Sequence, residues 1–252
     1  MLLPPSEGKT TPESGDPLDL DALGSPDLTA TRERILRTLV RVCSGNRARA
    51  MERLGLGPTQ AEAVERNATL PQQPTARADA VYTGVLYSAW DPAGRSAAAR
   101  ARAEDSVAVC SALFGLLRPG DPIPAYRLSG TVTLPRLGTV AGLWRPVLGP
   151  ELAERVGDGL LVDLRSGTYV NLHKPQGDLA ARTATIRVLH DSGGKRSVVS
   201  HFNKATKGRI VQALLEEGAE PHDVTDLAEA LADLGWTVER EGNRLDVVVS
   251  EV

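Results

Sequence analysis

The stretch from Leu113 to Leu128 limits the fold more than any other part of this chain. It reads Leu-Phe-Gly-Leu-Leu-Arg-Pro-Gly-Asp-Pro-Ile-Pro-Ala-Tyr-Arg-Leu and contains three prolines. Each proline fixes its own φ angle and restricts the residue before it. Such a segment cannot form an ordinary helix, and its prolines exclude it from the centre of a β-sheet. We therefore expect a rigid, non-repetitive loop.

Two arginines and a tyrosine project from this predicted loop: Arg118, Tyr126 and Arg127. A stiff backbone that carries cations is suited to holding an anion. Arginines in a rigid crossover can also do no more than cap backbone carbonyls. Residue types alone leave both interpretations open.

The overall charge limits the kinds of partner that the chain can have. Of the 252 residues, 41% are apolar and 24% are charged, which is ordinary for a globular protein. The net charge is −3, so the whole molecule is not a polycation that coats nucleic acid. Binding to nucleic acid would need a local basic patch. Residues 32 to 53 offer one, because they contain seven arginines and two glutamates.

Several other classes of protein are disfavoured by the sequence. Cys43 and Cys110 lie far apart in apolar runs, so we expect two buried thiols in a reducing compartment. The four histidines lack the HxH and HExxH spacings, so we expect no metal and no cofactor. The N-terminus does not have the pattern of a signal peptide, and no run approaches 18 apolar residues. We expect a cytoplasmic monomer without a membrane segment.

Helix and strand patterns alternate along the chain. Together they predict one α/β domain, 1–252, with a central mixed sheet and flanking helices. Helices are expected at 29–43, from 46, from 58 to about 66, and at 96–105, 148–157, 204–217 and 223–234. Strands are expected within 1–10 and at 80–84, 106–114, 160–164, 184–189, 197–202, 236–240 and 244–249.

A Gly-x-Gly motif lies between two predicted helices. The whole element, at about 30–67, resembles a helix-hairpin-helix. Its glycines would let the backbone approach a phosphate, and N–H groups at the start of the next helix would bind it. Nearby arginines would add salt-dependent affinity for DNA. An ordinary glycine at a helix end explains the same pattern. The predicted DNA contacts are Arg47, Arg49, Arg53, Gly55, Leu56, Gly57 and Thr59.

Three other places could carry chemistry. Gly8-Lys9-Thr10 is similar to the end of a phosphate-binding P-loop, but the first glycine of that motif is absent. Lys204 and Lys207 lie near a predicted helix start, where cations oppose the helix dipole unless an anion is present. Ser166 follows a predicted strand and is a candidate nucleophile, although a serine in a turn explains it as well.

Taken together, these pieces resemble the YaaA family of bacterial proteins, which is linked to peroxide stress. The Leu113–Leu128 segment and Val81-Tyr82-Thr83-Gly84 are the most specific matches. The segment 86–95 and the C-terminal tail depart from the family pattern. The other matching positions are Pro5, Ser6, Lys9, Thr10, Leu54–Ala61, Leu143, Trp144, Leu164, Ser166, Tyr169, Ser200–Lys204, Lys207 and Gly208.

The resemblance implies a single compact α/β domain with a basic cleft. It also implies a helix-hairpin-helix that binds duplex DNA without strong sequence preference. Members of the family are associated with limiting oxidative DNA damage by keeping free iron low. The resemblance therefore implies duplex DNA as the partner.

A second hypothesis is that the chain is an enzyme or binds a small anion. The matched residues lie on at least five segments, and if these meet they would form a cationic pocket for a phosphate or carboxylate. A lysine there could act as a base or nucleophile. The catalytic candidates are Lys9, Arg118, Tyr126, Arg127, Ser166 and Lys204. The candidate anion contacts are Lys9, Thr10, Tyr82, Thr83, Arg118, Arg127, Tyr169, Lys204 and Lys207.

Overall fold

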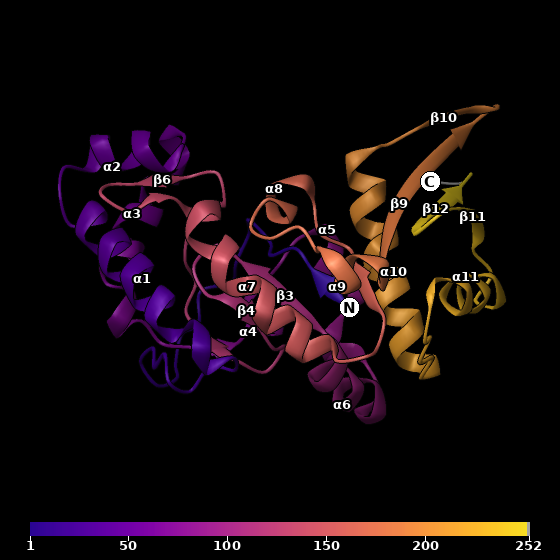
Figure 1. Ribbon diagram of the computed structural model, residues 1–252. Helices are drawn as coiled ribbons and strands as arrows, with labels where there is room; N and C mark the ends of the chain where they lie inside the picture. Colours follow the sequence, from indigo (N-terminus) through magenta and orange to yellow (C-terminus); the bar gives the residue numbers. More distant parts are fainter. Residues whose placement is uncertain (251–252) are drawn as a thin grey trace.

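One mixed sheet organises the computed structural model, which describes residues 1–250 apart from the side chains of residues 195 and 200. The strand order is β11-β12-β9-β8-β1-β3-β4, and β10 pairs with β9 (Figure 1). Strands β12, β9, β8, β1 and β3 are mutually parallel, whereas β4, β10 and β11 run antiparallel to their neighbours. Their bounds are β1 Leu2–Leu3, β3 Ala108–Ser111, β4 Gly115–Leu117, β8 Leu161–Asp163, β9 Thr183–Ser192, β10 Lys195–Ser197, β11 Thr237–Glu241 and β12 Arg244–Val249.

The central strands are short and apolar because both faces of the sheet are covered there. Every residue of β1, β3 and β8 is buried, as expected for parallel strands between layers of helix. The longer helices are α1 Thr29–Cys43, α2 Arg47–Leu54, α3 Glu62–Ala68, α5 Val85–Trp90, α6 Ala97–Ser106, α7 Val140–Val156, α10 Ser200–Glu217 and α11 Val224–Asp233.

Two groups of helices lie at the ends of the molecule, and the remaining helices lie over its middle (Figure 1). Helices α1, α2 and α3 lie at one end of the molecule, and α10 and α11 lie at the other, beside β9 and β12 (Figure 1). Shorter pieces join these elements: β2 Ala76–Arg77, α4 Ala78–Val81, β5 Pro122–Ile123, β6 Thr133–Leu134, β7 Gly138–Thr139, α8 Gly167–Val170 and α9 Gly177–Ala181. The expected α/β domain with a central mixed sheet is confirmed.

The Leu113–Leu128 segment forms the edge of the sheet and then a rigid loop. Its first part is β4, the edge strand, and its second part contains β5, which pairs with β2 in a separate two-stranded sheet. Arg32 of α1 is fully buried and donates from Nε to the carbonyl of Phe114 at 2.8 Å and from Nη2 to that of Leu116 at 2.9 Å. This guanidinium therefore fixes α1 against the edge of the sheet. The absence of helix within this segment, predicted from its prolines, is confirmed.

Three expected elements differ from the structure, and one helix is additional. Residues 80–84 do not end a strand, because α4 runs to Val81 and only an isolated bridge joins Tyr82 to Lys9. The strand expected at 197–202 ends at Ser197, and α10 begins at Ser200. Helix α7 begins eight residues before the expected start. The prediction began too late because Pro146 and Pro150, which lie within the helix, resemble helix breakers. Helix α5 was not expected at all.

Candidate functional site

A cavity of about 770 Å³ opens where the direction of the chain across the sheet changes. From β1 the chain passes to β3 on one side, whereas β8 is followed by β9 on the other. In open α/β sheets ligands bind outside the carboxyl ends of the strands at such a switch point. The residues after β1, Pro4–Gly8, and those after β8, Leu164–Tyr169, both line this cavity.

Two helices and β9 complete the walls. Helix α5 and the residues before it contribute one side, and the first turns of α10 contribute another. The lining residues outside the two strand-end loops are Thr83, Gly84, Val85, Leu86, Tyr87, Ser129, Ile186, Arg187, Asn203, Lys204 and Lys207. The cavity therefore combines apolar walls with hydroxyls and cations, a usual make-up for a small-molecule site.

Lys207 is the buried cation of this cavity. It is 8% exposed, and its Nζ donates to the backbone carbonyl of Leu164 at 3.1 Å. Burial lowers the pKa of its amine to about 8, while the negative charge of Asp163 opposes the shift. That carboxylate is already held by Arg165, with Nε to Oδ1 at 2.9 Å and Nη2 to Oδ2 at 2.7 Å. Lys207 thus faces the cavity without a carboxylate bonded to it among the described residues.

Lys9 lies one layer behind the cavity, against two tyrosine rings. Its Nζ donates to the carbonyl of Ser6 at 2.7 Å and lies 4.2 Å from the ring centre of Tyr126 and 5.2 Å from that of Tyr82. Burial lowers the pKa of Lys9 to about 7, and the charge of Glu7 opposes this shift. The two rings attract the ammonium form, which also opposes the shift. Lys9 therefore holds the Ser6 backbone in place at the cavity wall.

The two tyrosines are neutral hydrogen-bonding groups of the core. The hydroxyl of Tyr126 lies 2.8 Å from that of Tyr82 and 2.7 Å from Ser111 Oγ. Burial raises the pKa of both tyrosines well above the usual value of 10. Ser111 Oγ in turn accepts from the backbone N–H of Phe114 at 3.0 Å. This network ties the Lys9 loop to the first residues of the Leu113–Leu128 segment.

Two glycines allow the loop after β1 to lie against the turn before α5. Thr83 N–H donates to the carbonyl of Gly8 at 3.1 Å. A Cβ added at Gly8 would lie 2.8 Å from Thr83 Oγ1, and one added at Gly84 would lie 3.0 Å from Ser6 Oγ. Gly84 also has a φ of +96°, which residues with a side chain rarely adopt. Gly84 is therefore required by its backbone angle, whereas a Cβ at Gly8 would force the Thr83 hydroxyl to shift.

The structure brings most of the residues predicted from the sequence to this region. Thr83, Ser166, Tyr169, Lys204 and Lys207 line the cavity itself. Lys9, Tyr82 and Tyr126 form the layer behind it, and Arg127 forms an ion pair with Glu7, which lines the cavity. Thr10 is exposed beyond the cavity, with its N–H bonded to Val81 O at 2.9 Å.

Arg118 does not join this group. Strand β4 runs antiparallel to β3, so the residue that follows β4 lies at the opposite end of the strands from the cavity. There Arg118 is exposed, and its backbone N–H donates to Asp121 Oδ2 at 2.8 Å. The second hypothesis depends on whether Lys9, Arg118, Arg127 and Lys204 meet in one cleft, and Arg118 does not lie with the others because the chain reverses between β3 and β4.

The Gly-x-Gly motif connects α2 to a short 3₁₀ turn, Pro58–Gln60, that precedes α3. Gly55 ends α2 with a φ of +65°. The backbone N–H groups of the motif have partners in α2 and in the turn that follows the motif. Gly55 N–H donates to Glu52 O at 3.1 Å, and Leu56 N–H donates to Met51 O at 2.9 Å. Gly57 N–H donates to Gln60 Oε1 at 3.1 Å.

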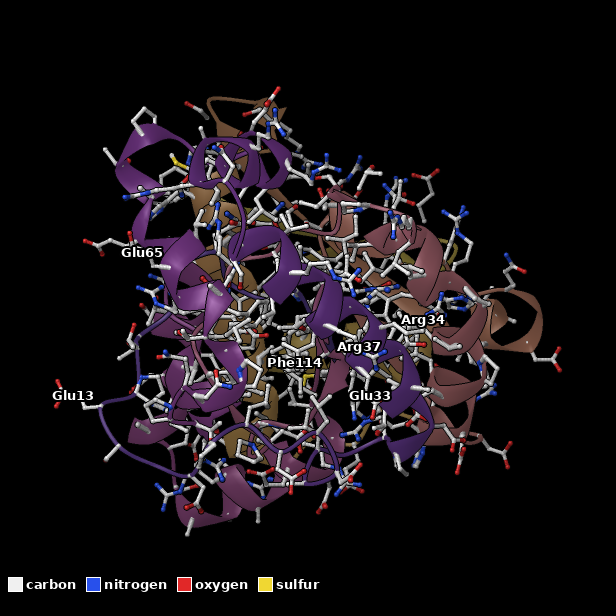
Figure 2. All side chains as sticks on the ribbon, turned by 90° about the vertical axis from the view of Figure 1, so that its left-hand side faces the viewer. Glu13, Glu33, Arg34, Arg37, Glu65 and Phe114 are labelled. Atoms are coloured by element: carbon white, nitrogen blue, oxygen red, sulfur yellow. The ribbon has the colours of Figure 1, made fainter. Side chains whose placement is uncertain are left out.

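Arginine side chains surround this motif and the neighbouring helix. Arg49 and Arg53 are exposed, whereas Arg47 pairs with Glu65 at 3.2 Å. Thr59 is exposed as well. Figure 2 shows Arg34 and Arg37 along α1 on the same end of the molecule. This end of the molecule carries exposed positive charge, apart from the cavity.

The cavity residues that lay outside the sequence prediction include Pro4, Tyr87, Ile186 and Arg187. Tyr87 donates from its hydroxyl to the carbonyl of Pro4 at 2.9 Å and closes one wall. The position of Pro4 and Pro5 directly after a short apolar strand was a usable signal. The others could not be found without the strand order, which no local pattern supplies.

The described part of the chain lacks two further features. No group of three or more His, Cys, Asp and Glu side chains within it is placed to hold a metal ion. None of its helices has both the length and the apolar character needed to cross a membrane.

The fold and the cavity define an α/β protein with a largely parallel sheet and a lysine-bearing pocket at its switch point. Residues 1–241 match the family described as peroxide stress protein YaaA, and the chain belongs to this family. It is 49% identical to a UPF0246 protein of Streptomyces coelicolor over 259 residues, covering 100% of this chain and 99% of that one. A UPF0246 protein of Corynebacterium efficiens is 39% identical over 249 residues, covering 97% and 96% of the two chains.

Proposed function

We propose that this protein binds a small ligand with a carboxylate or phosphate group in the cavity at the switch point, and acts on it during peroxide stress. One observation carries this proposal. The cavity gathers Lys204, Lys207 and the hydroxyls of Ser6, Ser166 and Tyr169 from three distant parts of the chain.

The electrostatics of the cavity favour an anionic ligand. A buried ammonium without a bonded carboxylate is costly, and a ligand anion would remove that cost for Lys207. Lys204 precedes it by one helical turn, is exposed, and lies close to the N-terminus of α10, where negative charge is favoured. The apolar walls, including Val85, Leu86 and Ile186, fit the rest of the ligand. The volume lies in the range of small-molecule sites.

Thermal shift against a panel of ligands tests this proposal. The panel contains inorganic phosphate, nucleoside monophosphates, α-keto acids and amino acids. A ligand at 100 times its Kd stabilises the folded protein by about 2.7 kcal/mol. We expect the shift to be lost in Lys207→Met and reduced in Lys204→Met. The matched control is Arg118→Ala, which lies outside the cavity and should keep the full shift. A shift that all three variants retain would place the ligand elsewhere.

Non-specific binding of duplex DNA is the second candidate function. The exposed arginines around α1 and α2, including Arg49 and Arg53, favour it. The N–H groups of the Gly-x-Gly motif already have partners, so side chains would supply the bonds to DNA phosphates. Removing one arginine that binds a phosphate should make the salt dependence of binding shallower by about one unit of slope.

A titration of duplex DNA at several salt concentrations tests the second candidate. We expect weaker binding and a shallower salt slope for the double variant Arg49→Glu, Arg53→Glu. The control is Arg209→Glu, an exposed arginine of α10. Equal weakening in both proteins would mean that net charge governs binding and that no defined surface of α2 takes part.

A further inference from the structure

We propose that Lys207 forms an imine with an aldehyde or ketone group of a ligand that also carries a carboxylate or phosphate. This inference rests on the proposed ligand-binding role of the cavity. It adds the identity of the reacting atom, the Nζ of Lys207, and the chemical class of the substrate.

The position of Lys207 meets the requirements for an amine nucleophile. The side chain lines the cavity and is 8% exposed, so a bound ligand would lie beside it with little intervening water. Its hydrogen bond to Leu164 O, 3.1 Å long, uses one N–H. A neutral amine held in this way keeps its lone pair available for a second neighbour.

The surroundings of Lys207 make its neutral form more accessible than that of an ordinary exposed lysine. Asp163 is the acidic residue whose charge acts on the Lys207 amine. Both of its carboxylate oxygens already accept hydrogen bonds from Arg165. The Arg165 side chain is completely buried, so this pair is closed off from solvent. An ammonium at Lys207 therefore lacks a bonded counter-ion among the residues described. The lowered pKa of this amine, about 8, agrees with that geometry.

The two other lysines near the cavity are less suited to this role. The sequence has five: Lys9, Lys174, Lys195, Lys204 and Lys207. Lys9 is held against aromatic rings behind the cavity wall and does not line the cavity, so a bound ligand would not lie beside its amine, although burial lowers its pKa to about 7. Lys204 is exposed and fits the role of anchoring the anionic group of the ligand. Lys207 combines a place in the cavity with burial.

The reaction balances without any further reactant. The nitrogen lone pair attacks the carbonyl carbon, a C–N bond forms, and the carbonyl oxygen takes a proton. The nitrogen then loses a proton, the new hydroxyl takes a second proton, and the C–O bond breaks so that one water leaves. The nitrogen gives up its other proton as the C=N bond is completed. The product is an imine, which withdraws electrons from the neighbouring carbon. Ser166, Thr168 and Tyr169 line the same cavity and offer hydroxyls for the proton transfers.

Reductive trapping of the full-length protein tests this inference. The protein is incubated at pH 7.5 with glyoxylate and cyanoborohydride, and a second sample receives pyridoxal phosphate and borohydride. Peptide mapping then measures the adduct on each lysine. We expect adduct at Lys207 at least about tenfold faster than at Lys204, because attack requires the neutral amine. The rate should rise with pH to a plateau, with its midpoint near pH 8.

Variants and outcomes separate this inference from the proposed function. Lys204→Met should retain the Lys207 adduct, and Lys207→Met should abolish it. The map of the wild-type protein gives the site even if Lys207→Met fails to fold. Adduct spread over the exposed lysines, or none at Lys207, overturns the imine. If the thermal shift with phosphate or α-keto acids persists in that case, the cavity still binds anions. If that shift is absent too, both proposals fail.

Discussion

Gly208→Ala should lower the stability of this protein although alanine is the better helix former. Gly208 lies where α10 crosses α5. A Cβ added there would lie 2.2 Å from the carbonyl oxygen of Leu86, 2.8 Å from Ala89 Cβ and 3.0 Å from the backbone nitrogen of Trp90. Two of these atoms belong to the backbone, so no side-chain rotation relieves the clash. One helix must move by about 1 Å.

The size of the effect follows from two opposing terms. Alanine in place of glycine within a helix gains about 1 kcal/mol. Overpacking of a rigid interface costs about 1–3 kcal/mol, occasionally more. Because the clash is with backbone atoms we take the upper end of that cost and expect a net loss of about 2 kcal/mol, which corresponds to a fall in Tm of about 4–8 °C for a domain of this size. Because Leu86 and Lys207 line the cavity, the same movement should weaken ligand binding.

Urea unfolding followed by tryptophan fluorescence measures this change. Trp90 lies on α5 and is 1% exposed, so it reports directly on the packing of the two helices. Gly167→Ala is the matched control, since its added Cβ meets no atom of the described residues within 4 Å. We expect Gly208→Ala to unfold at lower urea concentration than wild type, and Gly167→Ala to match or exceed wild type. Equal midpoints for the two variants would refute the close packing of α10 on α5.

Two further predictions concern charges beside the cavity. Between pH 8 and about 10.5 the unfolded protein keeps a proton on Lys207 that the folded protein has lost. The stability of the wild-type protein therefore rises with pH in this range. The Lys207→Met variant should therefore have a free energy of unfolding about 1–3 kcal/mol above that of wild type at pH 7, and a smaller gain at pH 10. Thermal melts at both pH values measure this difference, and equal gains at the two pH values would contradict the prediction. Asp163→Asn should cost about 3–5 kcal/mol in urea unfolding because the Arg165 guanidinium stays buried, and adding Arg165→Met should recover part of that loss.

Elements with a clear period were predicted well from the sequence. Helix α1 was expected at 29–43 and is observed there, because Ile35, Leu36 and Leu39 give it one continuous buried face. The C-terminal hairpin was also confirmed, because β11 and β12 pair in antiparallel fashion on either side of Gly242-Asn243. Where tertiary packing decides the outcome, the prediction failed. Helix α5 has six residues and depends on α10 for its stability, so its local pattern is weak.

The candidate site shows the same division between local and long-range information. Lys204 and Lys207 were found because cations near a helix start conflict with the helix dipole, and Ser166 because it follows a strand. Arg118 was grouped with them on its segment alone, and the reversal between β3 and β4 separates it.

The cavity residues are brought together by the place of β1 between β3 and β8, strands that begin about 105 and 160 residues further along the chain. No local pattern contains that order, since it results from which buried strands pair. A chain with the same motifs but β1 at a sheet edge would carry these lysines and hydroxyls on separate surfaces. The strand order is therefore the strongest structural argument for a small-molecule site in this protein.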